Sequence, residues 1–393
     1  MPSHSDPIRA LLVQPTLAKY RLPVYRELAG REGIDSLLWY GDHNPGMNVE
    51  PDGFAAELKP IKSWRLAGQE ALWHQAQIDA TERKDVDALV LSWGSRYLSL
   101  GPALRRAKRR GLPVVLWGHG YSRTENALSR WARNRIAKLA TVLMFYDEQT
   151  AAAAIESGWP ADRVFTAPNA IDQAPIAAAR DACLADSAAL NAFRESEELI
   201  GRRIVLYVSR FIPENRVELL IEAIDHLRKT KPEVLAVLVG GGQEFSRIDS
   251  MVAQRGLADH VRLLGPIYEE ERLASWFVSA DLFVYPAAIG LSLLHAFGYG
   301  LPVVTDDSST GHNPEIIAFD PHDGPNQNGA CYRTGDAASF ANTILRLMDD
   351  ETLRNTLSAN ALATIEQRYN VPAMVDGMEA ALRRCVELSR SLD

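Results

Sequence analysis

Short apolar runs alternate with amphipathic stretches along most of the chain. In the first half, helix-period patterns such as RLPVYRELAG and EQTAAAAIESG separate apolar runs at residues 8–14, 34–40, 87–93, 112–118, 141–147 and 163–168. Parallel β-strands joined by crossover helices produce this alternation. The first half is therefore predicted to form a parallel sheet covered by helices.

The alternation is interrupted once and then resumes. Residues 173–201 are alanine-rich and polar, which predicts a helix and a linker, and the tail from about 336 has a helical pattern. Between them, apolar runs recur at residues 203–209, 234–240, 261–265, 281–286 and 302–307, with a weaker one at 330–333. The pattern predicts an α/β fold with two doubly wound, Rossmann-like domains.

The interruption sets the expected domain bounds. We predict a first domain over residues 1–175, a linker helix over 176–201 and a second domain over 202–372, with a C-terminal helix (about 373–393) rejoining the first domain. The length of 393 residues agrees with two domains, because single cores stop growing at roughly 250–300 residues. Ligands bind at the carboxyl ends of strands in such sheets, so the domains are expected to face each other across a cleft.

Residues 282–305 contain no Asp, Glu, Lys or Arg and are long enough to span a bilayer. Pro286, Pro302 and three glycines interrupt the run, however, and divide it into a strand (282–285), a short helix (about 291–299) and a second strand (301–305). Parallel strands covered on both faces are almost continuously apolar. We therefore predict the buried centre of the second domain and not a membrane anchor.

Composition agrees with a cytoplasmic globular protein. Charged residues make up 23% of the chain and hydrophobic residues 47%. The N-terminal residues MPSHSDPIRA lack the pattern of a signal peptide. Cys183, Cys331 and Cys385 are too far apart in the sequence for a metal or redox motif, which favours a reduced compartment.

The net charge of −8 is unevenly distributed. Between residues 96 and 138, Glu125 is the one acid among eleven basic residues: Arg96, Arg105, Arg106, Lys108, Arg109, Arg110, Arg123, Arg130, Arg133, Arg135 and Lys138. Solvated helix faces explain such a region, and so does attraction to an anionic acceptor or to the anionic inner face of a membrane. Nucleic acid is not an expected partner, because the whole chain is acidic and no aromatic-interleaved basic motif is present.

Two arginines follow the first strand of the second domain. Arg210 comes directly after the run RIVLYVS, and Arg216 lies near the next helix start. The guanidinium group offers phosphate a planar set of donors and stays charged at any working pH. A strand-end arginine also serves as a structural ion-pair partner, and the sequence alone does not separate the two roles.

The run AAIGLS leads into the apolar helix LLHAFGY, so the amides of Gly290, Leu291 and Ser292 are expected at a helix start. Unpaired N–H groups and aligned peptide dipoles make helix starts phosphate-binding sites. The alternative is a helix that is merely buried. In TGHNPEI, Asn313 is predicted to cap a further helix start.

Glycines and one histidine mark further strand exits. VLVGGGQEF carries Gly240 to Gly242, which suit either close approach to a ligand or a plain tight turn. In LWGHG, His119 follows a strand, where it is either a substrate contact or an ordinary loop residue. No Ser/His/Asp arrangement or metal-ligand cluster is recognised, and no DxD-like metal site precedes the expected nucleotide cleft, so no metal requirement is predicted.

The combined motifs resemble those of GT-B-fold glycosyltransferases of family 4 (group 1), over nearly the full length. They are QPTLAKYRLPVYRELA, WGHG, FTAPNAID, YVSRFIPENRVELLIEAI, VGGGQE, GLSLLHAFGYGLPVVT, NPEI and NGACYRTGD. The resemblance implies sugar transfer from a nucleoside diphosphate donor, with retention at the anomeric carbon. It also implies an acceptor-binding first domain and a donor-binding second domain.

Three positions depart from the family pattern. Asn215 stands where a lysine usually follows the arginine, and Arg216 is the candidate replacement. Ala287 and His295 stand where the family carries two glutamates, of which the second holds the ribose hydroxyls. This chain is therefore a divergent branch that lacks the usual Glu pair.

The resemblance assigns expected roles to these residues. Arg210, Arg216 and His119 are the candidate catalytic residues, with Arg210 and the amides of 290–292 holding the diphosphate. The nucleoside is expected against His295, Gly241 and Gly265, and the acceptor against Lys19, Tyr20 and Arg21. The donor is expected to be a UDP-, GDP- or dTDP-sugar. The acceptor is expected to be a glycan, a lipid-linked hydroxyl or a small molecule. No cofactor is expected besides the donor. A nucleotide-sugar epimerase and a non-catalytic nucleotide-sugar-binding protein are the alternatives.

Overall fold

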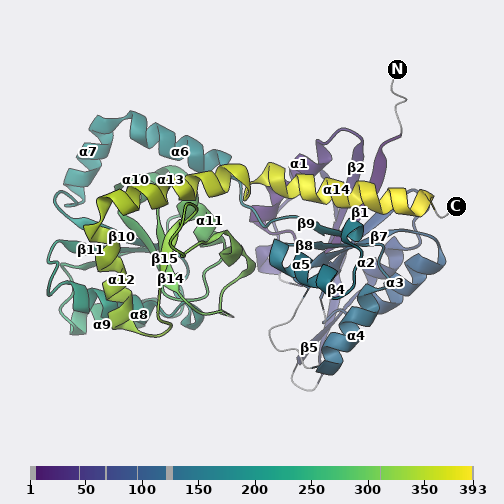
Figure 1. Ribbon diagram of the computed structural model, residues 1–393, viewed down its shortest axis with the longest axis horizontal. Helices are drawn as coiled ribbons and strands as arrows, with labels where there is room; N and C mark the ends of the chain where they lie inside the picture. Colours follow the sequence, from purple (N-terminus) through teal and green to yellow (C-terminus); the bar gives the residue numbers. More distant parts are fainter. Residues whose placement is uncertain are drawn as a thin grey trace. The chain divides into compact units, whose positions relative to one another are not determined.

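The computed structural model describes residues 6–43, 45–66, 69–94, 96–120, 127–309 and 311–391. The chain forms two compact units, one made of Met1–Asn169 with Val371–Asp393 and the other of Ala170–Asn370 (Figure 1). Of the basic region, Arg123 lies outside the described residues, as does Glu125.

The first unit is built on a seven-stranded parallel sheet with the order β3-β2-β1-β6-β7-β8-β9. The strands are β1 (Ile8–Gln14), β2 (Ile34–Tyr40), β3 (Ala55–Leu58), β6 (Ala88–Trp93), β7 (Val114–Gly118), β8 (Val142–Phe145) and β9 (Val164–Thr166). Helices of this unit are α1 (Leu22–Ala29), α2 (Gln75–Ala80), α3 (Leu100–Arg109), α4 (Ala127–Ala137) and α5 (Glu148–Glu156). The six apolar runs of the first half all contain a strand, as predicted.

Three strands of this unit were not predicted. β3 has only four residues, and Leu58 at its end is 51% exposed. β4 (Ile61–Leu66) and β5 (Gln69–His74) form an antiparallel hairpin of their own. Strands at a sheet edge or in an isolated hairpin bury little, so their apolar residues form no continuous run.

The second unit contains a six-stranded parallel sheet with the order β12-β11-β10-β13-β14-β15. The strands are β10 (Arg203–Val208), β11 (Val234–Val239), β12 (Val261–Gly265), β13 (Leu282–Tyr285), β14 (Val303–Asp306) and β15 (Gly329–Tyr332). The helices are α6 (Ala174–Ala185), α7 (Ser187–Ser196), α8 (Val217–Leu227), α9 (Phe245–Gln254), α10 (Glu270–Ser279), α11 (Leu291–Gly298), α12 (Ala337–Asp349) and α13 (Glu351–Gln367). Two parallel-sheet α/β units confirm the predicted fold class.

The uncharged run 282–305 forms β13, α11 and most of β14, as its prolines and glycines predicted. β13 and β14 are neighbours in the middle of the sheet, and both are buried along their whole length. The run is apolar because the sheet is covered on both faces. Among the described residues, no helix is both long and apolar enough to cross a membrane.

Two terminal segments complete the units. Residues 176–201, expected as a linker, belong to the second unit, because α6 and α7 pack against α10 there. The last helix, α14 (Val371–Arg390), belongs to the first unit and packs against α1, β8 and β9 (yellow in Figure 1). Gly377 permits this contact, because a Cβ atom there would lie 2.0 Å from the Thr166 carbonyl oxygen.

Candidate functional site

The strand order of the second sheet reverses between β10 and β13. Strands β11 and β12 extend the sheet on one side of this pair, and β14 and β15 extend it on the other. Doubly wound sheets bind ligands at the carboxyl ends of the strands at such a reversal. Arg210 follows β10 and Gly290 precedes the helix that follows β13, so the structure brings both predicted residues to this edge.

The loop that carries Arg210 is held by the buried side chain of Asn215. The Asn215 amide nitrogen donates to the Arg210 carbonyl oxygen at 2.7 Å, with the Tyr207 hydroxyl at 3.2 Å and Ser209 Oγ at 3.3 Å. The Arg210 side chain is exposed, and none of the described residues forms an ion pair with it. The loop therefore fixes the backbone of Arg210 and leaves its guanidinium group available to a ligand.

Tyr285, at the end of β13, connects the two strand exits. Its hydroxyl lies 2.9 Å from Ser209 Oγ. Burial raises the pKa of Tyr285, while the Ser209 hydrogen bond and the charge of Arg210 act in the opposite direction. Tyr285 therefore stays a neutral hydrogen-bonding group beside Arg210.

The start of α11 is open at the same edge. Among the described residues no side chain caps its first turn, which begins after Gly290. The N–H groups of Leu291 and Ser292 have no intrahelical partner in a first turn. Ser292 Oγ donates to the Val208 carbonyl oxygen at 3.3 Å, which joins this helix start to the end of β10.

Asn313 does not cap its own helix turn, so that prediction was wrong. No side-chain capping bond forms at Asn313, and its amide nitrogen instead donates to the Ala288 carbonyl oxygen at 3.0 Å. A Cβ atom on Gly290 would lie 2.9 Å from the same nitrogen. The side chain of Asn313 therefore borders the open helix start.

The three glycines after β11 form a tight turn on their own chain. A Cβ atom on Gly240 would lie 1.9 Å from the Ser209 carbonyl oxygen, and one on Gly242 would lie 2.5 Å from the Phe211 carbonyl oxygen. Both residues also have positive φ, at 148° and 142°. Backbone packing thus accounts for these two glycines without a ligand.

Gly241 and Gly265, both predicted at the nucleoside, lie close together. The Gly240 amide donates to the Gly265 carbonyl oxygen at 2.9 Å, and the Gly241 carbonyl oxygen accepts from the Phe211 amide at 2.8 Å. Strands β11 and β12 therefore end side by side, next to the loop of Arg210. Their contact with a nucleoside stays a prediction.

His295 pairs with a carboxylate that the sequence did not single out. Its Nε2 lies 2.8 Å from Glu270 Oε1, which also accepts a 2.6 Å bond from the Tyr299 hydroxyl. Burial opposes ionisation of Glu270, but the His295 and Tyr299 contacts outweigh it and hold the pKa of Glu270 below its usual range. The His295 position thus keeps a carboxylate beside it, supplied by α10. In the sequence, the acidic run YEEER (268–272) marks the segment that carries this carboxylate. The run does not show which of its glutamates points toward His295.

Arg216 and Ala287 lie at or beside positions where the family resemblance implies a lysine and a glutamate. Arg216 has left-handed backbone angles (φ 49°, ψ 44°) and ends the turn before α8. Its Nε atom lies 3.9 Å from Glu218 Oε1. Its Nη1 atom lies 3.4 Å from the position that a Cβ atom on Gly335, after β15, would occupy. Ala287 is buried, 9% exposed, and brings no polar side chain to the site.

The first unit gathers aromatic and basic residues at its strand exits. His119, after β7, packs on Tyr146, after β8, with ring centroids 4.6 Å apart. Arg21, after β1, is 8% exposed, with its guanidinium 5.2–5.3 Å from the ring centroids of Tyr20, Trp117 and Tyr146.

The neighbouring Lys19 is exposed to solvent. The structure therefore brings the predicted acceptor residues 19–21 and His119 to one edge of the first sheet. Throughout the described ranges, no three His, Cys, Asp or Glu side chains are close enough together to hold a metal ion.

The two sheets and their order define the GT-B class of fold, which the comparison with solved structures supports. The glycosyltransferase of Rickettsia africae aligns over 98% of this chain and 100% of its own, with a TM-score of 0.70 and 12% identity. The Anabaena HepE protein, solved with UDP, aligns over 96% of this chain and 100% of its own, with a TM-score of 0.70 and 17% identity.

Residues 191–364, which contain the strand-exit site, match the model of the family described as glycosyl transferases group 1. Over this segment the chain is similar to the group 1 glycosyl transferases, as its motifs predicted.

Two curated relatives extend over more of the chain. An alpha-D-kanosaminyltransferase of Streptomyces kanamyceticus is 29% identical over 70% of this chain and 71% of its own length. A GDP-mannose-dependent phosphatidylinositol monomannoside mannosyltransferase of Mycolicibacterium smegmatis is 27% identical over 59% of this chain. The alignment spans 61% of that relative's length.

Proposed function

We propose that this protein transfers a sugar from a nucleoside diphosphate sugar to a hydroxyl group of an acceptor. The proposal rests on one observation. Where the strand order of the second sheet reverses, the loop of Arg210 and the open start of α11 follow neighbouring strands, and Ser292 Oγ joins this helix start to the end of β10. The segment that holds both features is the one matched to the family. One relative is a GDP-mannose-dependent mannosyltransferase, and one structural neighbour was solved with UDP.

The proposed reaction breaks the bond between the anomeric carbon and the distal phosphate oxygen. Negative charge then develops on that phosphate, where Arg210 and the amides of Leu291 and Ser292 are preorganised to stabilise it. The acceptor oxygen forms the new bond to the anomeric carbon, and its proton leaves with the nucleoside diphosphate or to water. As in the family, we propose retention of configuration, which NMR of the product's anomeric proton tests.

The remaining predicted residues take roles around this centre. His119 positions the reacting sugar or hydroxyl, Arg216 supplies a second cation, and residues 19–21 contact the acceptor. The nucleoside lies against His295, Gly241 and Gly265, with Glu270 beside His295. No metal is proposed, so turnover is expected to survive EDTA.

The basic region 96–138 supports an anionic acceptor at the inner face of a membrane. On α3 the side chains of Arg105, Lys108 and Arg109 are exposed, whereas Arg106 pairs with Glu82 at 3.1 Å. Exposed cations add attraction to anionic lipids. Sedimentation with anionic and neutral vesicles tests this, and equal binding to both would contradict it.

Nucleotide release from a panel of UDP-, GDP- and dTDP-sugars, with and without mixed acceptors, tests the proposed function. Acceptor-dependent release of one nucleotide is expected, and Arg210→Ala should lower the rate about 10²- to 10³-fold, as loss of one charge-stabilising donor does. Conversion of the donor sugar without acceptor would instead identify an epimerase. Binding without release under every condition would identify a non-catalytic protein.

A further inference from the structure

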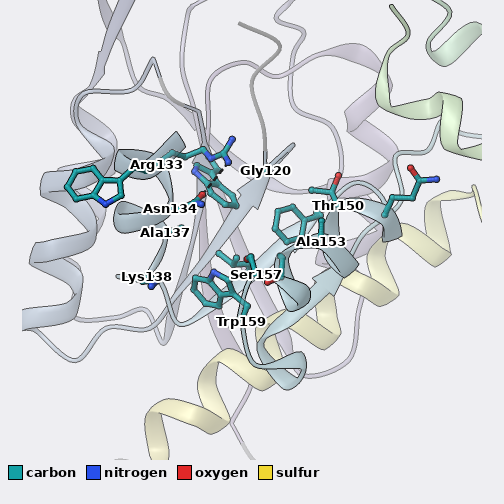
Figure 2. A pocket seen from close by; sticks show the side chains of 15 residues that line it. Gly120, Arg133, Asn134, Ala137, Lys138, Thr150, Ala153, Ser157 and Trp159 are labelled. Carbon is teal, nitrogen blue, oxygen red and sulfur yellow. Dashed lines mark hydrogen bonds between the residues drawn. The ribbon is translucent and has the colours of Figure 1, made fainter. Parts of the chain in front are cut away.

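A cavity of about 740 Å³ lies in the first unit, between α4, α5 and the loop that holds Trp159. Small-molecule sites in proteins typically measure about 300–1,000 Å³. Figure 2 shows side chains of α4 and α5 facing this space from two sides, with Trp159 at one end. The cavity therefore has the size of a ligand site, and all of its lining residues belong to the first unit.

The walls combine aromatic surface with positive charge. Trp93, Trp131, Trp159 and Phe145 line the cavity, and the Trp93 and Phe145 rings are 5.7 Å apart. Trp131 is 59% exposed, which is unusual for so large an apolar side chain.

The charged lining residues are Arg133 and Lys138, and no Asp or Glu is among the described residues that line the cavity. The guanidinium of Arg133 lies 5.8 Å from the Trp93 ring centroid. Such walls complement a ligand that is apolar in its body and carries an acidic group.

The cavity reaches the strand exits where the acceptor is proposed to bind. Gly120, after β7, and Thr150, in the first turn of α5, both line it. His119 precedes Gly120 and packs on Tyr146 at that edge. A molecule held in the cavity therefore extends toward the position where an acceptor hydroxyl is expected.

We propose that this cavity binds the apolar body of an amphipathic acidic acceptor, with its phosphate or carboxylate near the exposed side chain of Lys138. The inference rests on the proposed function, because it names the substrate class of that reaction. Contact with the aromatic walls removes apolar surface from water, and the ammonium group of Lys138 selects an acid over a neutral headgroup. A small neutral sugar would neither cover the aromatic walls nor pair with the positive charge.

Binding of single-chain probes tests the inference directly. Decyl phosphate, sodium decanoate and decyl glucoside, all below their micellar concentrations, are titrated into the full chain while tryptophan fluorescence is recorded. An acidic probe is expected to quench saturably and to bind about two- to five-fold more tightly than the glucoside, which is the contribution of one exposed ion pair. The affinities of decyl phosphate and decanoate show whether the cavity prefers a phosphate or a carboxylate group. No saturable change, or equal affinity for the neutral probe, overturns the proposal.

Matched variants locate the binding. Ala153 lines the cavity, whereas Ala152 is an exposed neighbour on α5 that does not. Ala153→Phe is expected to weaken binding of the acidic probe at least ten-fold, and Ala152→Phe to leave it unchanged. Lys138→Gln should lose most of the preference for acid, and Lys229→Gln, which removes an exposed charge from the second unit, should keep it. Equal effects within either pair contradict the assignment.

Calorimetric titration of UDP and GDP into the same variants separates this inference from the proposed function. If a nucleotide binds and no acidic probe does, the cavity proposal fails and the function stands. If the probe binds in the cavity and no nucleotide binds, the function fails, and with it the acceptor role of the cavity.

Discussion

The amide nitrogen of Asn215 donates to the carbonyl oxygen of Arg210 at 2.7 Å. Asn215 is 4% exposed, at the position where the family resemblance implies a lysine. Its neutral side chain fixes the loop of Arg210 and offers no charge to a phosphate. Arg210 is therefore proposed as the principal cation at the reversal of strand order.

The first prediction concerns that hydrogen bond. Asn215→Ala should lower the free energy of unfolding by about 1–3 kcal/mol, because it removes the buried hydrogen bonds to the Arg210 carbonyl oxygen and the Tyr207 hydroxyl. Affinity for the nucleoside diphosphate should fall as well, since the Arg210 loop loses its restraint. Urea denaturation and calorimetry measure the two effects. Asn215→Asp keeps the size of the side chain but removes both N–H donors, so it should lose stability and affinity as Asn215→Ala does. Stability and affinity equal to those of the original chain in the Asp variant would contradict the account.

The second prediction concerns room at the start of α11. Gly290→Ala should weaken nucleoside diphosphate binding, because its Cβ would meet the Asn313 amide nitrogen at 2.9 Å, beside the open amides. Asn313→Ala in the same chain should restore part of the affinity by removing the clash. Gly46→Ala, at a position with nothing within 4 Å, is the control. Full affinity in Gly290→Ala alone would exclude this helix start as the binding site.

The third prediction places a glutamate at position 295, where the family resemblance implies one. His295→Glu should lower the free energy of unfolding near neutral pH by roughly 1–3 kcal/mol, because it places a second carboxylate against Glu270 in place of a hydrogen-bonded partner. The deficit should shrink in acid, where one of the two carboxyl groups takes up a proton. Adding Glu270→Gln should recover most of the loss in thermal unfolding. A stable single variant would show that the two side chains do not interact.

The fourth prediction concerns acid stability of the first unit. Burial lowers the pKa of His74 to about 4, from 6.5. The unfolded chain therefore binds a proton that the folded chain rejects, so stability is complete above about pH 6.5 and falls as the pH drops toward 4. The slope should be about 1.4 kcal/mol per pH unit, for a total of about 3 kcal/mol. His74→Gln should lack this component in calorimetric unfolding at several pH values. An identical pH dependence in both proteins would contradict it.

The sequence predicted the sheets because their strands are buried on both faces. Every strand from β10 to β15 contains or overlaps an apolar run, and Arg210 and Gly290 could be found because they follow such runs directly. β3 and the β4–β5 hairpin escaped prediction, since residues such as Leu58 and Trp64 remain about half exposed, at 51% and 46%. Continuous apolarity reports burial and misses strands that bury little.

The partners of the predicted residues depend on contacts between distant segments. Glu270 reaches His295 from another helix, and Asn313 reaches Ala288 from a later loop. The cavity of the first unit combines Trp93, Trp131 and Trp159 from three separate elements. Spacing along the chain carries no signal for such groups, because the fold alone brings them together.

A crystal of the chain soaked with UDP or GDP tests the central claim most directly. The account predicts electron density for the distal phosphate against the amides of Leu291 and Ser292, with the Arg210 guanidinium within hydrogen-bonding distance. A nucleotide bound elsewhere, or a diphosphate that contacts neither group, would contradict it.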